Sequence, residues 1–156
     1  DRPSSYHETI GYNYRLSNVS AGIGCGQMDV LQPHVELRRA IHDFYTKELA
    51  EIDGLSVQQN PSTDFNSNFW LSTVLIDPKT GKDPESLRQF MLDAGVETRR
   101  LWRPMHMQPV FADAPYYGDT TCETLFDRGL CLPSGSGLKE EELRYVADKI
   151  KEFFNK

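Results

Sequence analysis

Apolar residues recur at helical spacing over the second quarter of the chain. Between His34 and Ile52 they stand mostly three or four positions apart, at Val35, Leu37, Ile41, Phe44, Tyr45, Leu49 and Ile52. Pro33 interrupts the pattern just before this stretch, and Gly54, a residue type common at helix C-termini, follows it. The spacing predicts one amphipathic helix over residues 34–52.

A different kind of helix is predicted just before it. Ser17 or Asn18 is suited to cap its N-terminus, because a side-chain oxygen there can accept a hydrogen bond from a free backbone N–H. The segment that follows contains Gly22, Gly24 and Gly26, and each glycine inside a helix costs about 1 kcal/mol relative to alanine. Such a helix is favoured where another backbone approaches closely. We therefore expect tight packing there, with another subunit as a candidate neighbour.

Three short segments predict β-strands, and the polar stretch over residues 56–68 predicts a loop. Phe69–Ile76 carries the strongest strand pattern, followed by Val96–Trp102 and Gly129–Leu132. Two further helices are expected: one begins after the cap residue Asp83 and closes at Gly95, and one begins near position 139. Strands separated by helices indicate an α/β (α+β) fold with a small mixed sheet of three to four strands, flanked by helices, and a long helical arm. The strand order stays open.

The composition is that of an ordinary globular domain. The chain has 156 residues, with 17 Lys and Arg against 23 Asp and Glu, and a formal charge of -6. This acidic balance argues against a general nucleic-acid or anionic-membrane binder, and no apolar run approaches the roughly 20 residues of a membrane span. Three cysteines without a C-x-x-C pair favour reduced thiols in a cytoplasmic protein. The sequence starts at Asp1, with neither an initiator methionine nor a signal peptide, so we expect it to be the interior of a longer chain.

Two clusters carry candidate chemistry. The first is Tyr12-Asn13-Tyr14-Arg15, directly before the predicted cap of the glycine-rich helix. Asn and Arg beside a helix N-terminus can donate hydrogen bonds to a phosphate, because free N–H groups and partial positive charge gather there. A loop whose aromatic residues anchor it to a core is an equally open interpretation.

The second cluster runs from Arg99 to Pro109 and holds three arginines, Trp102 and His106. A site for a phosphorylated or nucleotide ligand could use arginine for oxyanions and tryptophan for stacking. A strand end with salt bridges, and with Trp102 in the core, is the other interpretation. No lysine stands in a setting suited to a Schiff-base nucleophile, and the histidines are too isolated to predict a metal site.

Taken together, the two clusters resemble the pyridoxal-phosphate-dependent nucleotide-sugar aminotransferases of the DegT/DnrJ/EryC1/StrS family. The matching segments are Gly11–Asn18 with Gln27, Glu97–Pro109 and Gly129–Ser134. The resemblance implies the C-terminal part of a fold-type I aminotransferase, with residues 1–54 as the end of the large domain and connecting helices, and residues 55–156 as the small domain. The family's Schiff-base lysine precedes this region, so the chain is expected to be inactive alone.

The same resemblance implies the reaction and the roles of five residues. The complete protein would use pyridoxal 5'-phosphate to move an amino group from a donor such as glutamate to a nucleotide-linked keto-sugar, for surface polysaccharide or glycan synthesis. A UDP-linked 4-keto-6-deoxy-hexosamine is the favoured subclass. Asn13 and Arg15 would bind the cofactor phosphate or the partner of a homodimer, and Arg99, Trp102 and His106 would contact the nucleotide-sugar.

Two departures and two alternatives qualify this interpretation. Arg100 and Arg103 differ from the residues expected in the family, so neither receives a family role. A sugar dehydratase of the same family, with histidine in place of the lysine, fits the sequence equally, because the deciding position lies upstream. A non-catalytic module for nucleotide-sugar binding or dimerisation is the alternative from a different class. Neither nucleic acid, nor a membrane, nor a metal ion is expected as a partner.

Overall fold

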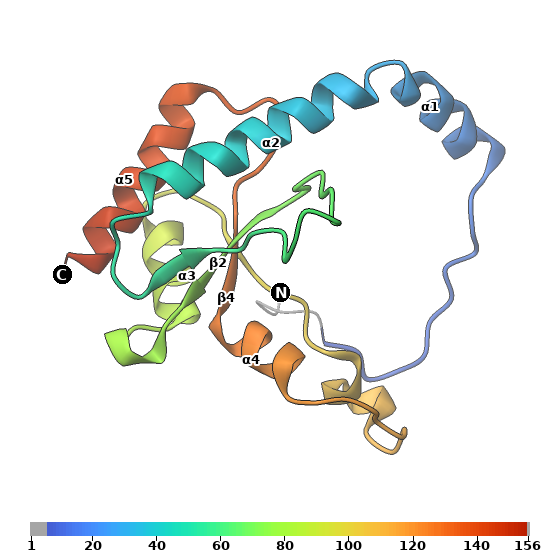
Figure 1. Cartoon of the computed structure of the whole chain (residues 1–156). Helices are drawn as coiled ribbons and strands as arrows, with labels where there is room; N and C mark the ends of the chain where they lie inside the picture. The colour runs from blue at the N-terminus through green and yellow to red at the C-terminus, as the bar shows by residue number, and fades with distance from the viewer. Residues whose placement is uncertain (1–5, 156) are drawn as a thin grey trace.

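The computed structural model of the protein describes residues 6–155 and contains five α-helices and four β-strands within them (Figure 1). The helices are α1 (Asn18–Met28), α2 (Leu31–Glu48), α3 (Pro84–Asp93), α4 (Thr121–Arg128) and α5 (Glu140–Phe154). The strands are β1 (Leu55–Val57), β2 (Ser72–Ile76), β3 (Arg99–Arg100) and β4 (Gly129–Leu132). Three 3-10 turns complete the set: η1 (Pro78–Thr80), η2 (Met105–Met107) and η3 (Pro109–Phe111). None of the helices over these residues is long and apolar enough to cross a membrane.

The four strands form one sheet in the order β1-β2-β4-β3. Every pairing is antiparallel, with Val74 opposite Leu130 and Arg99 opposite Cys131. The α/β (α+β) class and the strand number are therefore confirmed, and the sheet is antiparallel throughout rather than mixed. Strand β4 lies between β2 and β3 and pairs with both of them.

The hydrophobic core lies on one face of this sheet, beneath α2, α3 and α5. In β2 every second residue is buried, which is the periodicity of a half-buried strand, whereas all four residues of β4 are buried. The core combines Val74, Ile76, Leu130 and Leu132 of the strands with Ile41 and Tyr45 of α2, Leu87 and Met91 of α3, and Leu143, Val146, Ala147 and Ile150 of α5. Tyr45 is fully buried, and its hydroxyl donates a hydrogen bond to the Pro133 carbonyl at 2.9 Å.

Two helix starts follow the predicted capping chemistry. The Ser17 hydroxyl accepts a hydrogen bond from Ser20 N–H at 3.2 Å, which confirms Ser17 as the cap of α1. Asp83 Oδ1 accepts hydrogen bonds from the N–H groups of Glu85 and Ser86, at 2.9 and 3.0 Å, and caps α3. Both caps supply acceptors to N–H groups that have no partner inside the helix.

Several predicted boundaries were wrong. Pro33 does not interrupt a helix: it lies in the first turn of α2, where its missing N–H costs no hydrogen bond. That helix ends at Glu48, before Ile52. The loop predicted over residues 56–68 begins inside β1, whose three residues are too short to show a period. Strand β3 covers only two residues of the seven predicted, and helix α4 was not predicted.

An exposed arm and helix α1 extend away from the rest of the protein (Figure 1). Residues 6–17, here called the N-terminal arm, contain no helix or strand, and no residue of α1 is buried. Nothing within the described chain comes within 4 Å of a Cβ placed on Gly22, Gly24 or Gly26. The close approach expected at these glycines is therefore not made by the described part of this chain.

Candidate functional site

The first cluster lies in the middle of the N-terminal arm. Asn13 and Arg15 are both exposed, and Asn13 Oδ1 accepts a hydrogen bond from Arg15 N–H at 3.1 Å. Tyr14 and Arg15 have φ values of 50° and 68°, in the left-handed region that residues other than glycine rarely enter. The turn at Asn13 leaves the side chains of Tyr14 and Arg15 exposed, and Tyr12 is exposed beside them. The aromatic residues do not anchor this segment to the core.

The base of the arm is bound to the second cluster. The N–H of His7 donates to Gln108 Oε1 at 2.8 Å, and the N–H of Val110 donates to the His7 carbonyl at 3.2 Å. Gln108 is almost fully buried. The fold thus brings the base of the arm to the second cluster, although 101 positions separate His7 from Gln108. Asn13 and Arg15 lie farther along the arm.

Arg99 begins β3 at the edge of the sheet. Its side chain is 79% exposed, and its Nη2 lies 2.6 Å from Glu97 Oε1. Its guanidinium makes a fork-like contact, since Nε also donates to the same oxygen at 2.9 Å. Exposed ion pairs contribute only about 0–1 kcal/mol, so this contact can exchange for a stronger anionic ligand.

Trp102 is exposed rather than part of the core. Its ring lies beside the ring of Trp70, with centroids 5.8 Å apart and an angle of 32° between the planes. The two side chains are 57% and 58% exposed. The interpretation of Trp102 as a core residue was wrong, and its neighbour Trp70 comes from the distant segment that precedes β2.

His106 is held in place by two neighbours. Its Nε2 lies 2.8 Å from Glu123 Oε1, and its ring stacks on Tyr116 with centroids 3.9 Å apart. The hydrogen bond with the Cys122 thiol is the main cause that raises the pKa of Tyr116 to about 12. His106 is partly buried and points toward α4 rather than freely into solvent.

The other two arginines of the cluster are structural. Arg100 donates from Nη2 to the Phe126 carbonyl at 2.6 Å, and its guanidinium lies over the Phe126 ring. Arg103 lies between the rings of Tyr6 and Phe126, with centroid distances of 5.5 and 5.0 Å. Cation–π contacts of this kind fix the packing of α4 against the arm.

A mostly apolar cavity of about 430 Å³ lies where these parts meet. It joins the arm, the second cluster and α4, and its lining includes His7, Trp102, Gln108, Cys122 and Phe126. Apolar pockets with a few polar groups are the usual form of a small-molecule site. Asn13 and Arg15 do not line it, and neither does Arg99.

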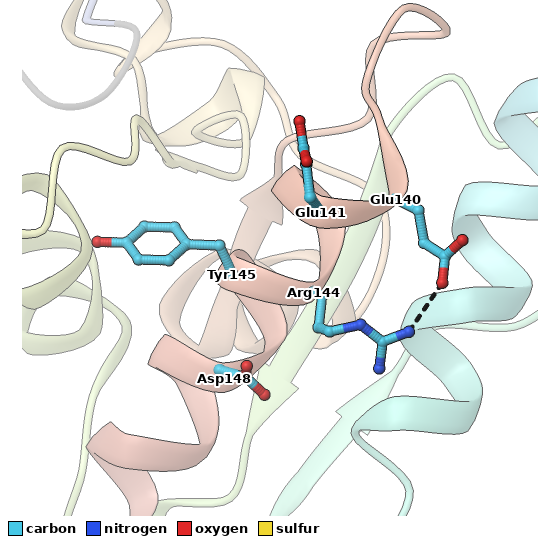
Figure 2. Close-up of a pocket in the computed structure, with 5 residues that line it drawn as sticks. All are labelled: Glu140, Glu141, Arg144, Tyr145 and Asp148. Carbon is cyan, nitrogen blue, oxygen red and sulfur yellow. Dashed lines mark hydrogen bonds and ion pairs between the residues drawn. The ribbon is translucent and has the colours of Figure 1, made fainter.

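A second hollow on helix α5 has a different character (Figure 2). Glu140 and Arg144 form an exposed pair at 2.8 Å on the side of α5 that faces α2. Tyr145 points the other way and donates from its hydroxyl to the Ala94 carbonyl at 3.0 Å. These are ordinary surface contacts, and none of the residues predicted to bind a ligand lies there.

Sequence reasoning missed three residues of the candidate site. Trp70 was hidden inside a strand predicted to begin at Phe69, whereas the structure begins that strand three positions later, at Ser72. Tyr116 and Glu123 come from a segment that was given no structure, so nothing linked them to His106. A tryptophan next to an asparagine- and serine-rich loop was the available signal for Trp70.

Known proteins resemble the chain over nearly its whole length. The model of the DegT/DnrJ/EryC1/StrS aminotransferase family matches residues 1–151. The Bacillus subtilis protein EpsN, named as a pyridoxal phosphate-dependent aminotransferase, is 40% identical over 153 residues, covering 96% of this chain and 39% of EpsN. GDP-perosamine synthase of Escherichia coli O157:H7 is 32% identical over 150 residues, covering 96% of this chain and 40% of the enzyme.

A solved structure gives the same result at the level of the fold. DesV of S. venezuelae superposes with a TM-score of 0.79 at 25% identity, over 96% of this chain and 40% of DesV. The chain therefore spans about two fifths of the length of the relatives that it matches.

Proposed function

Because the chain belongs to the DegT/DnrJ/EryC1/StrS aminotransferase family, we propose that it is part of a pyridoxal-phosphate-dependent aminotransferase that aminates a nucleotide-linked keto-sugar. The amino group comes from a donor such as glutamate, and the product serves surface polysaccharide synthesis. The names of EpsN and of GDP-perosamine synthase support this reaction class. The family match over residues 1–151 carries the proposal. The hydrogen bonds of His7 with Gln108 and Val110 support it, because they hold the base of the N-terminal arm against the second cluster.

The N-terminal arm fits one part of the cofactor, its phosphate. Asn13 and Arg15 offer an amide and a guanidinium on an exposed turn, and a guanidinium binds phosphate oxygens in pairs. Lys82, Lys149 and Lys151 each donate to a protein oxygen, so these three amines do not suit covalent attachment. When bound, pyridoxal phosphate supplies the electron sink for amino transfer. As the family resemblance implies, we take the covalent lysine to lie in the remainder of the protein.

The second cluster suits the nucleotide-sugar. Arg99 can release Glu97 and bind a diphosphate oxygen, because a charge-assisted contact to phosphate is stronger than an exposed ion pair. Trp102 offers an exposed ring face for the ligand. His106, oriented by Glu123, can hold a hydroxyl or phosphate oxygen by its remaining ring nitrogen. Their common role is to bind and orient the substrate.

The exposed arm and α1 support a homodimer. Val19, Ile23 and Met28 of α1 are exposed apolar side chains, and contiguous apolar surface commonly marks an interface.

We assign residues 1–54 to the end of the large domain with its connecting helices, and residues 55–156 to the small domain. Free thiols at all three cysteines support a cytoplasmic location.

The test is an assay of the complete protein, with the reading frame upstream of Asp1 included. Purified protein is incubated with glutamate, pyridoxal phosphate and a UDP-linked 4-keto-6-deoxy-hexosamine, and both products are measured. We expect amino-sugar and 2-oxoglutarate in equal amounts, since each amino group gained by the sugar is lost by one glutamate. The sugar's carbonyl oxygen leaves as water, and water supplies the carbonyl oxygen of 2-oxoglutarate. GDP- and dTDP-linked keto-sugars are compared in parallel to identify the nucleotide.

Two other outcomes contradict the proposal. Loss of water from the sugar without consumption of glutamate would identify the dehydratase of the same family. Binding of the nucleotide-sugar with neither reaction would identify a non-catalytic module. Histidine in place of the cofactor-binding lysine in the upstream sequence would support the first of these outcomes.

A further inference from the structure

Two tryptophans stand side by side on the surface, outside the hydrophobic core. Trp70 and Trp102, here called the tryptophan pair, are 58% and 57% exposed, although tryptophan is largely buried in most proteins. They are also the two tryptophans of the whole chain. Their centroids lie 5.8 Å apart, within the range of directly contacting rings. A ligand ring therefore has no room between them and would stack on an outer face.

The backbone that carries Trp70 is held in a rare conformation. Phe69 has φ 45°, a left-handed value that costs a residue with a side chain free energy and tends to occur at functional sites. The N–H of Phe69 donates to Ser67 Oγ at 3.0 Å, and the N–H of Trp70 donates to Asn68 Oδ1 at 3.0 Å. These local hydrogen bonds stabilise the turn that directs the chain at Trp70.

Helix α2 fixes the same loop from its other side. Arg38 Nη1 donates to the Trp70 carbonyl at 2.5 Å and to the Ser134 carbonyl at 3.0 Å. Arg39 Nε donates to the Ser67 carbonyl at 3.0 Å. The buried ring of His42 stacks on Phe69 with centroids 3.6 Å apart. Three side chains of one helix therefore hold an exposed aromatic residue in place before any ligand binds, which lowers the entropic cost of binding.

The charge near the tryptophan pair favours an anionic ligand. Arg99 lies three residues before Trp102, and its exposed guanidinium pairs with the surface carboxylate of Glu97. Three residues of chain span at most about 11 Å, a separation that a ribose and a diphosphate can bridge. A ligand in which a flat ring is joined to a diphosphate could stack on the tryptophan pair with its ring and bind Arg99 with its phosphate oxygens.

We propose that Trp70 and Trp102 form a stacking platform for the nucleobase of a nucleoside diphosphate, with Trp70 as an additional substrate-binding residue. This rests on the proposed function, in which such a nucleotide carries the keto-sugar. Every nucleobase has a ring face that stacks on an aromatic side chain, so the platform supplies affinity and orientation. Selection among bases falls to other groups.

The test uses the intrinsic fluorescence of the full 156-residue chain, because both emitting tryptophans belong to the platform. UDP and GDP are titrated with excitation at the red edge of the tryptophan band, and pyrophosphate serves as the probe without a base. We expect saturable quenching by UDP and GDP and none by pyrophosphate. Absence of saturable quenching at millimolar UDP and GDP, or equal quenching by pyrophosphate, overturns the proposal.

Variants separate stacking from general surface effects. Trp70→Ala should weaken UDP binding, measured by calorimetry, about tenfold, while Trp70→Phe should retain most of the affinity. Tyr117→Ala removes another exposed aromatic side chain and should leave the affinity unchanged. Equal affinity of Trp70→Ala and the wild type would overturn the proposal.

The complete protein distinguishes this failure from failure of the proposed function. If amino transfer occurs and Trp70→Ala leaves the KM for the nucleotide-sugar unchanged, the platform is wrong and the function stands. If UDP binding depends on Trp70 but no amino transfer occurs, the platform stands and the function is wrong. With both correct, Trp70→Ala should raise the KM for the nucleotide-sugar about tenfold, whereas the control Tyr117→Ala should leave that KM unchanged.

Discussion

The N–H of His7 donates a hydrogen bond to Oε1 of Gln108 at 2.8 Å, between residues 101 positions apart. Because Gln108 is almost fully buried, its amide has little freedom to follow the arm if the arm moves. The contact therefore fixes where the N-terminal arm leaves the folded part of the chain. It also sets the direction from which Asn13 and Arg15 extend.

Replacement of Gln108 by alanine should release the base of the arm. A buried hydrogen bond that loses one partner costs about 1–3 kcal/mol, so the N–H groups of His7 and Val110 should exchange with deuterium markedly faster. Gln89→Ala is the matched control, because Gln89 is an exposed glutamine whose side chain donates to Asp93 Oδ1 on the same helix. Unchanged exchange at both N–H groups in Gln108→Ala would show that other contacts anchor the arm.

The cap of α3 should make stability depend on pH. Hydrogen bonds from the backbone N–H of Ser86, and further from Glu85 N–H, hold the pKa of the Asp83 carboxyl below its ordinary value. The folded state therefore favours the carboxylate, and the resulting stability is present above the ordinary pKa of about 3.9. It is lost as the pH falls through the lowered pKa of the folded state.

Urea unfolding of Asp83→Asn and Asp83→Ala between neutral and acidic pH measures this effect. Asparagine keeps a capping oxygen but no titrating group, so its stability relative to the wild type should improve as the pH falls. Alanine removes the cap and should cost about 1 kcal/mol at neutral pH. A constant difference between wild type and Asp83→Asn across the acidic range would exclude the carboxylate as the source.

The three thiols should react at two different rates. Cys25 and Cys122 are exposed, whereas Cys131 is 5% exposed in the central strand. Burial raises the pKa of Cys131 to about 11, which lowers the fraction of reactive thiolate at neutral pH. A thiol reagent should therefore modify two cysteines quickly and the third only after urea is added. Cys131→Ser should abolish the slow phase; fast modification of all three in folded protein would show that β4 opens readily.

Local rules predicted the parts of the fold that short segments determine. The Asp83 cap, with Pro84 at the first helical position, and the limits of β4 came from neighbouring residues, and the structure confirms them. Strand β1 depends on pairing with β2, where Leu55 lies opposite Ile76, and three residues carry no period of their own. Helix α4 depends on the contacts of Phe126 with two arginines, which no local pattern contains.

The candidate site shows the same division. The composition of the second cluster indicated Trp102 and His106, because an indole and an imidazole among arginines are uncommon on a plain surface. Their partners Trp70 and Glu123 lie 32 and 17 positions away in the chain, and contacts over such separations need the folded structure. The fold also decides which arginine faces solvent: Arg100 and Arg103 pack on the Phe126 ring, whereas Arg99 is exposed.

Gly129, the first residue of β4, lies against Leu101, which follows β3 and directly precedes Trp102. Its φ of -98° is open to any residue, but a Cβ there would overlap Leu101 Cδ1 and come within 2.6 Å of the Leu125 carbonyl oxygen. Gly129→Ala should therefore destabilise the fold by about 1–3 kcal/mol through overpacking. Because Leu101 precedes Trp102, its displacement should also weaken the near-ultraviolet circular dichroism of the tryptophan pair. Gly135→Ala is the control, since nothing lies within 4 Å of a Cβ there; equal stability and equal dichroism of the two variants would show that β3 and α4 separate without cost.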